Sequence, residues 1–280
     1  MRFKTKARLL ILPGLAGFLI FYIIPFFWSF LYAFTNNPLQ LRFVGLANFI
    51  DSLRNRYYLL ALRNTLNFTV IGVIVIVLFS ISVSALLSTA GKRYGFLHIA
   101  FILPMLLPTG GVALIWRMLF NPDGAIGHIK PFLPSYLGSV LSPQILPVYF
   151  IFIWRYCGFN IILLVAAISG IQRDINEAAA LDGAGGWKLY TRITLPLIHP
   201  TLFFIMVLSI VNSFRIYKEM YYLFDTNYPH ESVYILQYYM NNHFQKLNYQ
   251  MLSSGAIIFA AIVFLIVFFG YRADIKGGQL

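Results

Sequence analysis

The chain has little charge and almost no cysteine. Only 11% of its residues are charged, whereas about one quarter are charged in an average soluble domain. Cys157 is the single cysteine, which excludes an internal disulfide and a metal site built from several cysteine ligands. The hydrophobic share is 59% and the mean hydropathy is +0.75. These values indicate a membrane protein.

The charge that is present is mostly positive and widely spread. The formal net charge is +12, but the basic residues stand singly around apolar runs and form no stripe suited to nucleic acid. Anionic lipid headgroups are the counterpart that this pattern favours.

Motifs of common enzymes are also missing. A P-loop needs a glycine five residues before Gly-Lys and a Ser or Thr after it, but Gly91-Lys92 has Leu86 and Arg93 at these positions. His230-Glu231 is followed by Tyr234 where a zinc protease helix needs a second histidine. The residues therefore favour a protein that is not an enzyme and binds no metal or cofactor itself. A membrane-embedded protease remains an alternative.

Long apolar runs predict an all-α, polytopic fold. A spanning helix needs about 20 mostly apolar residues. Six windows meet this length: Leu9 to Phe34, Leu66 to Ser88, His98 to Phe120, Ile145 to Ile171, Leu197 to Phe214 and Ser254 to Tyr271. The third window contains Pro104 and Pro108, so we expect it to be bent and buried in the helix bundle.

The positive-inside rule predicts that both termini are cytoplasmic. Four basic residues precede the first apolar run, namely Arg2, Lys4, Lys6 and Arg8. That run is too long for the core of a signal peptide, so we interpret it as a retained helix. The segment 35–65 argues against this orientation, because it would be outside and carries Arg42, Arg54, Arg56 and Arg63.

A partly charged segment, residues 174–200, lies between the fourth and fifth apolar windows. Asp174 is suited to an N-cap, Glu177 would follow in the first turn, and Gly183 is suited to end the helix. The expected product is a short cytoplasmic helix over Ile175–Leu181, with Trp187 and Tyr190 as apolar anchors beyond it. Leu195-Pro196 marks the return to the membrane.

This segment resembles the EAA signature of permease subunits of ATP-binding-cassette importers. The matching residues are Glu177, Ala178, Ala179, Asp182, Gly183, Ala184, Leu195 and Pro196. Three further segments narrow the resemblance to carbohydrate-type permeases, similar to the first permease of maltose and glycerol-phosphate importers. They are Phe43–Phe49, Phe101–Gly127 and Asn212–Leu223. Tyr190 stands where the family often has Phe. The alternative is an interfacial amphipathic loop without a partner.

The resemblance implies a multi-pass protein of a bacterial or archaeal cell membrane, with residues 1–280 as one permease domain. Its implied partners are a homologous second permease, two ATP-binding subunits that hold ATP and Mg, an extracytoplasmic solute-binding protein and the solute. The EAA residues would couple the permease to the ATPase. The implied function is import of sugars or oligosaccharides. Alternatives are a non-sugar solute such as glycerol phosphate, or an ATP-independent carrier or channel.

Polar residues inside the spans are candidates for the solute path, because burying them in lipid is costly. Planar polar groups and aromatic faces suit a sugar, which favours Trp116, Asn160, Asn212 and Tyr217. Arg117, Arg155, Ser209 and Ser213 are further polar residues in these windows. A second interpretation stays open: Asn160 and Ser209 would only join helices, while Trp116, Arg117 and Arg155 would be anchors at the headgroup level.

Overall fold

The computed structural model describes residues 11–37, 42–90, 95–121, 124 and 144–277. Within these residues every regular element is helical, apart from one antiparallel bridge between Thr35 and Phe43. Five helices there are long and apolar enough to cross a membrane: Ile11–Ala33, Arg56–Ser88, Ile145–Ser169, His199–Phe224 and Tyr249–Arg272. A sixth candidate is a bent pair of shorter helices. The predicted all-α, polytopic fold is confirmed.

The helices divide into two compact units. The first unit contains residues 1–62 and 236–265, and the second contains residues 63–235 and 266–280. Each unit is described by itself. The prediction of a single domain stays a prediction, as does the orientation of the termini, since Arg2 to Arg8 lie outside the described residues.

In the first unit, small polar side chains join helices that are far apart in the sequence. The unit contains α2 (Ile24–Ala33), α3 (Ala47–Arg54), the start of α4 (Arg56–Ala90), α14 (Leu236–Gln245) and most of α15 (Tyr249–Gly277). Ser52 and Ser254 share a hydrogen bond of 2.8 Å, and the Tyr58 hydroxyl donates to the Gly255 carbonyl at 3.0 Å. Gly255 lets the Tyr58 ring approach, because a Cβ there would be only 2.9 Å from that ring.

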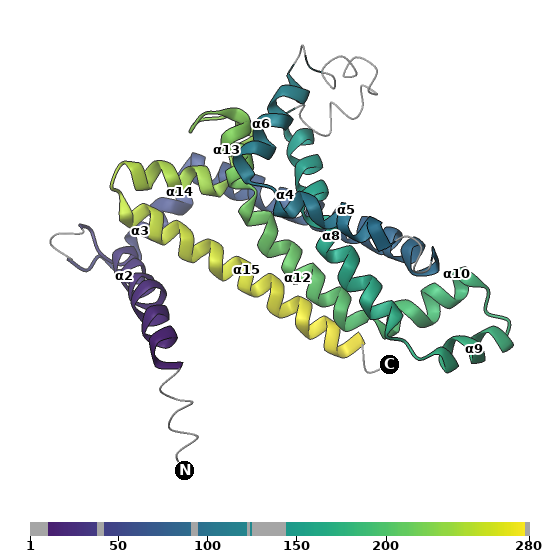
Figure 1. Ribbon diagram of the computed structural model, residues 1–280. Helices are drawn as coiled ribbons and strands as arrows, with labels where there is room; N and C mark the ends of the chain where they lie inside the picture. The colour runs from purple at the N-terminus through teal and green to yellow at the C-terminus, as the bar shows by residue number, and fades with distance from the viewer. Residues whose placement is uncertain (1–10, 38–41, 91–94, 122–123, 125–143, 278–280) are drawn as a thin grey trace. The chain divides into compact units, whose positions relative to one another are not determined.

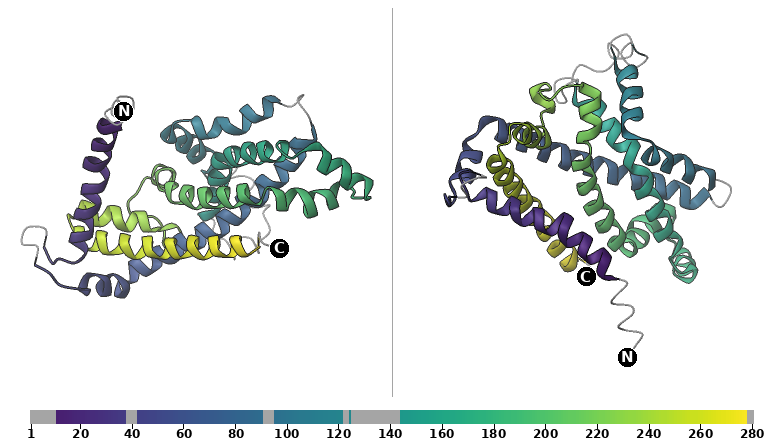
Figure 2. Two further views of the ribbon diagram at one scale, coloured as in Figure 1. Left: turned by 90° about the horizontal axis from the view of Figure 1, so that it is seen from below. Right: turned by 60° about the vertical axis from the view of Figure 1, so that its left-hand side comes forward.

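In the second unit, α8 (Ile145–Ser169) is the most buried candidate span, with half of its apolar window inside the protein. The other helices are most of α4, then α5 (Gly95–Leu106), α6 (Thr109–Phe120), α9 (Arg173–Leu181), α10 (Gly186–Leu189), α11 (Leu195–Leu197), α12 (His199–Arg215) and α13 (Tyr217–Phe224). Helices α8 and α12 run along one another (Figures 1 and 2). Leu164, Ile198 and Ile205 form a cluster between them.

The predicted third span is broken, as its prolines indicated. Helices α5 and α6 meet at an angle of 102°. Pro104 lies inside α5, and Pro108 stands directly before α6. Proline supplies no backbone N–H and clashes with the preceding turn, so two prolines at this spacing interrupt the helix.

Other helix boundaries differ from the prediction as well, and the sixth span begins at Tyr249 and not at Ser254. The fifth span continues beyond Phe214 through α13 to Phe224, because Arg215, Lys218 and Glu219 lowered the apolar signal without stopping the helix. The second predicted span, α4, begins at Arg56 and not at Leu66, and Asn55 accepts hydrogen bonds from the N–H groups of Tyr57 and Tyr58 at its start. Thus the basic residues of this region belong partly to a helix that continues into the membrane.

Candidate functional site

The predicted motif helix is present as α9, and glycine ends it as expected. The N–H of Ala184 donates to the Ala179 carbonyl at 3.0 Å, and Gly183 has a φ of +75°. This bond closes six residues around a left-handed residue, which is the Schellman ending of a helix. Glycine adopts this φ without a steric penalty. The sequence pattern therefore places the end of α9 by local backbone chemistry alone.

The predicted start of this helix, Ile175, was two residues too late. Helix α9 begins at Arg173, so Asp174 lies in its first turn and is not the N-cap. A carboxylate in the first turn still interacts favourably with the positive end of the helix dipole. The error changes the role of Asp174 but not the position of the helix.

The motif turns its large apolar side chains outward. Leu181 is 90% exposed and Trp187 is 78% exposed. Glu177 and Asp182 are exposed beside them. In Figure 1, α9 and α10 lie at one end of the second unit, beyond the ends of α8 and α12. Exposed apolar groups rimmed by charge are typical of a surface that binds another protein.

The remainder of the motif is anchored in the second unit. The Tyr190 hydroxyl donates to the carbonyl of Ile81 in α4 at 3.1 Å. Burial raises the pKa of Tyr190, and a hydrogen bond with Ser84 opposes this rise. Thr194 and Ile198 are buried, and Leu195 packs against the cluster around Ile205. The exposed helix α9 is thus joined through a short chain segment to the buried helices.

Asn160 and Ser209 join two helices, as the second interpretation proposed. The Asn160 amide donates to the Ser209 hydroxyl at 2.9 Å, which links α8 to α12. A parallel link between Thr69 and Ser213, also of 2.9 Å, connects α4 to α12. Asn212 lies between these links in the sequence and is only 4% exposed. The four hydrogen-bonded side chains therefore take part in helix packing.

The two aromatic candidates also have neighbours within the chain. Trp116 is buried, with ring contacts to Phe120, Phe150 and Trp154. Tyr217 is half-buried beside Tyr221. The contacts that the described structure gives Trp116, Asn160, Asn212 and Tyr217 do not bring the four together, so their assignment to the solute path stays a prediction.

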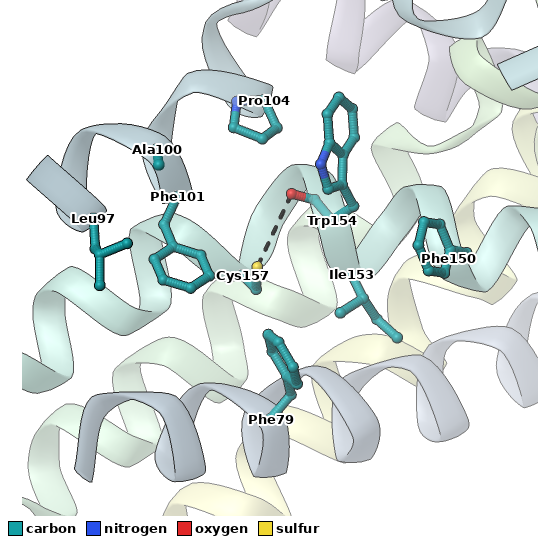
Figure 3. Close-up of a pocket in the computed structure, with 9 residues that line it drawn as sticks. All are labelled: Phe79, Leu97, Ala100, Phe101, Pro104, Phe150, Ile153, Trp154 and Cys157. Carbon is teal, nitrogen blue, oxygen red and sulfur yellow. Dashed lines mark hydrogen bonds between the residues drawn. The ribbon is translucent and has the colours of Figure 1, made fainter. Parts of the chain in front are cut away.

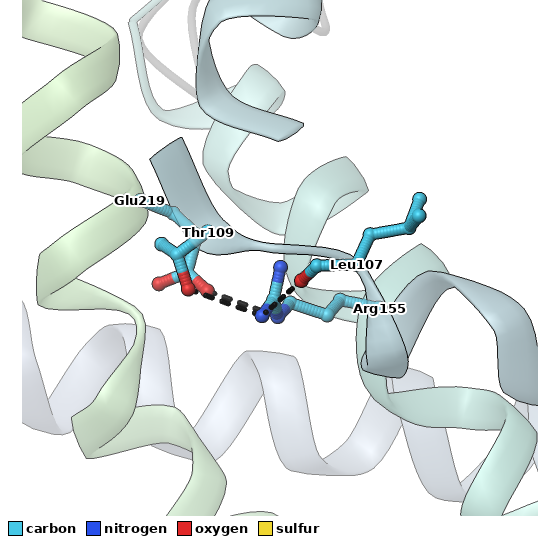
Figure 4. Close-up of polar contacts among 4 residues, drawn as sticks. All are labelled: Leu107, Thr109, Arg155 and Glu219. Carbon is cyan, nitrogen blue, oxygen red and sulfur yellow. Dashed lines mark hydrogen bonds and ion pairs between the residues drawn. The ribbon is translucent and has the colours of Figure 1, made fainter. Parts of the chain in front are cut away.

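A buried ion pair is the feature that the sequence analysis missed. Arg155 of α8 pairs with Glu219 of α13, with 3.1 Å between Nε and Oε1 (Figure 4). Their side chains are 9% and 3% exposed, so Arg155 is not the headgroup anchor that the second interpretation made it. Glu219 was overlooked because the predicted fifth span ended too early. A lone arginine within an apolar window was the available signal, since such a charge normally has a partner.

A second ion pair connects the same part of the unit but is open to its surroundings. Arg117 of α6 pairs with Asp225, which follows α13, at 3.0 Å. Both side chains are about half exposed or more. Exposed pairs contribute little to stability. We therefore expect this pair to contribute less to the stability of the permease than the buried pair.

A pocket of about 460 Å³ lies between α4, α5 and α8 (Figure 3). Its lining is almost entirely apolar and consists of Phe79, Leu97, Ala100, Phe101, Pro104, Phe150, Ile153, Trp154 and Cys157. A polyhydroxylated solute needs several hydrogen-bonding groups, which this lining does not offer. None of the four predicted solute residues belongs to it.

The comparison with known families decides the class of protein. The sequence profile described as binding-protein-dependent transport system inner membrane component matches residues 82–274, which include the motif, α8 and the helices after it. The chain belongs to this family. It is therefore a multi-pass permease of the cell membrane, and the resemblance noted for the EAA segment is confirmed at the level of the family.

Two curated permeases resemble this one along most of their length. The arabinooligosaccharides transport system permease protein AraP of Bacillus subtilis is 28% identical over 277 residues, which are 94% of this chain and 85% of AraP. The sn-glycerol-3-phosphate transport system permease protein UgpA of Salmonella typhimurium is 32% identical over 219 residues, which are 76% of this chain and 74% of UgpA.

A solved structure shares the fold. It is a crystal structure of a bacterial ABC transporter involved in the import of the acidic polysaccharide alginate, with a TM-score of 0.80 and 21% identity. The match covers 98% of this permease and 96% of the solved chain.

Proposed function

We propose that this permease imports sugars or oligosaccharides and forms half of the translocation pathway. The observation that carries the solute class is the similarity over most of the chain to a permease for arabinooligosaccharides, joined by the fold shared with an alginate importer. The four candidate residues Trp116, Asn160, Asn212 and Tyr217 offer amide and aromatic groups of the kind that bind sugars.

In this proposal the motif segment couples the permease to a separate ATPase. Glu177 and Asp182 supply exposed charge, while Leu181 and Trp187 supply exposed apolar surface. Tryptophan is enriched in binding hot spots, and exposed apolar groups rimmed by polar residues mark protein–protein interaction sites. ATP and Mg would be held by that partner, because this chain lacks a P-loop at its Gly-Lys pair.

The anchored end of the motif supports transmission of movement. Tyr190 holds the segment to α4, and Leu195 and Ile198 hold it to the cluster between α8 and α12. A displacement of α9 by a docked ATPase would therefore move helices that cross the membrane. A homologous second permease and an extracytoplasmic solute-binding protein complete the proposed assembly.

Glycerol phosphate is the second candidate solute, favoured by the similarity to UgpA. The two candidates differ in charge, because a phosphate ester needs cationic partners such as arginine. Within the described part of the second unit, Arg155 and Arg117 already have acidic partners. These two arginines are therefore less available to a phosphate group than unpaired cations would be.

Uptake by the purified transporter in proteoliposomes tests the proposal. The transporter is purified from its membrane with its binding protein, and ATP-dependent uptake is measured for labelled oligosaccharides and for glycerol phosphate. We expect uptake of a sugar that needs both ATP and the binding protein. Uptake of glycerol phosphate and of no sugar would show that the solute is a phosphate ester. Uptake without ATP would contradict the proposed coupling to an ATPase.

A further inference from the structure

The break between α5 and α6 creates a demand for hydrogen-bond donors. The last carbonyls of a helix have no partner within it, and α5 ends at Leu106, directly before the break. Pro104 and Pro108 cannot donate from their backbone nitrogens. Lipid offers no donors either, so a broken span needs donors from the protein or from water.

Arg155 meets this demand on both sides of the break. Its Nη2 group donates to the Leu107 carbonyl and to the Thr109 hydroxyl, each at 3.1 Å (Figure 4). Leu107 lies after α5, and Thr109 is the first residue of α6. One planar guanidinium thus fixes the two ends of the break relative to α8. Arginine suits this task because its donors are held in a rigid fork.

The positive charge of the Arg155 guanidinium accounts for the presence of Glu219 beside it. A buried cation without a partner is costly, and Glu219 supplies the counter-charge from α13 at 3.1 Å. Glu219 Oε2 and Arg155 Nη1 are buried without a hydrogen-bond partner within the described structure. The contact is therefore a single-bonded pair and not the bidentate arrangement that would maximise its strength.

The helix before the break is seated equally closely on α8. Gly158 lies one turn beyond Arg155, and a Cβ there would overlap with the carbonyl group of Phe101 in α5. Backbone contact at Gly158 and side-chain donation from Arg155 therefore hold neighbouring parts of the same bent pair. The bend of 102° has two separate attachments to one helix.

We propose that Arg155 is a positioning residue for transport, which fixes the angle between α5 and α6 by donating across the break. Glu219 acts only as its counter-ion. The link to transport rests on the proposed function, whereas the link to the bend does not. An ordinary ion pair would keep its role when the two charges are exchanged. A donor to the break would not, because a glutamate at position 155 cannot donate to Leu107.

The test therefore combines Arg155→Glu with Glu219→Arg in the transporter purified from its membrane. Cys157→Ser removes the only native cysteine, and spin labels are attached to cysteines that replace Leu103 in α5 and Met118 in α6, both exposed. The distance between these labels reports the bend. Labels at Val70 and Leu86 of α4 serve as the reference, because 16 helical residues separate them by about 24 Å.

We expect the exchanged pair to broaden the Leu103–Met118 distances and to lower uptake by about tenfold or more, since the buried acceptors of the break lose their donor. Arg155→Lys keeps a charge and several donors, so its distances and uptake should lie between those of the exchanged pair and the native protein. The matched control exchanges the exposed pair, Arg117→Glu with Asp225→Arg, and should change uptake by less than about twofold.

Native distances and uptake in the exchanged pair would overturn the proposal, because charge alone would then suffice. Native distances combined with lost uptake would also overturn it, since Arg155 would act in some other way than through the bend. If the exchanged pair does not assemble, Arg155→Lys decides: unchanged distances and uptake contradict the proposal, and a partial shift in both supports it. The distance measurement stands even if the solute is not a sugar.

Discussion

Helix α8 and the motif helix α9 follow one another in the chain but use their side chains in opposite ways. In α8, polar groups point inward and find partners, as Arg155 does with Glu219 and Asn160 with Ser209. In α9 and its continuation, large apolar groups point outward, as Leu181 and Trp187 do. The polar groups of α8 thus make contacts inside the protein, whereas the apolar groups of α9 and α10 stay available for the proposed contact with the ATPase.

The largest expected effect concerns the packing of α8 inside the protein. Gly158→Ala should destabilise the permease by about 3 kcal/mol, because the new Cβ meets the α5 backbone and cores tolerate such overpacking poorly. Thermal unfolding in detergent measures the effect.

Gly186→Ala is the matched control, since a Cβ there meets nothing within 4 Å. It should be neutral or slightly stabilising, because alanine favours a helix over glycine. Equal melting temperatures for both variants would contradict the close packing of α5 on α8.

The next largest effect concerns the exposed motif helix α9. Gly183→Pro cannot adopt the φ of +75° that ends α9, and Glu177→Lys reverses an exposed charge in the same helix. Both variants should reach the membrane yet lose most of the coupling between ATP hydrolysis and uptake. Hydrolysis and uptake are measured together in proteoliposomes, and normal uptake by both variants would remove the coupling role.

The exposed apolar groups sharpen the comparison further. Leu181→Ala and Trp187→Ala should each weaken binding of the ATPase by about 2 kcal/mol, as truncation of a hot spot does, without changing the thermal stability of the permease alone. Binding is measured by titrating the purified permease with the ATPase.

Met118→Ala, which truncates an exposed side chain in α6, serves as the control and should bind the ATPase normally. Loss of stability in the Leu181 or Trp187 variants would show that these groups pack within the chain.

The smallest effect concerns the link between the two regions. Tyr190→Phe removes the hydrogen bond to Ile81 and should lower stability by about 1 kcal/mol, or about 2 °C in melting temperature. Tyr228→Phe, at an exposed position, should leave the melting temperature unchanged. An equal loss in both variants would argue that Tyr190 does not anchor the motif.

The parts of the fold that follow from local chemistry could be predicted from the sequence. Apolar length identified the spans, the prolines identified the broken one, and Gly183 identified the end of α9. The role of Asp174 was wrong because a shift of two residues in the helix start moved its carboxylate from the cap into the first turn. The extension to Phe224 was missed because the charge of Glu219 is compensated by a residue 64 positions away, Arg155, which composition in a window cannot register.

The surface of α9 could be predicted from the sequence, whereas the solute path could not. The reason is again the distance in sequence between the residues that meet. The surface of α9 depends on neighbouring residues, so its pattern was visible in the sequence. The solute path depends on which faces of several helices meet, and Asn160 shows that a polar residue can instead serve packing. The family match then confirmed the class of protein that the EAA segment had indicated.

A photo-activated cross-linker at position 181 tests the central claim most directly, because Leu181 is the most exposed of the motif's apolar residues. The variant is expressed in its native membrane, illuminated and analysed by mass spectrometry, with the same cross-linker at Met118 as the comparison. The account predicts a product with an ATP-binding subunit from position 181 and not from position 118. Products with lipid alone at position 181, in a transporter that still takes up its solute, would contradict it.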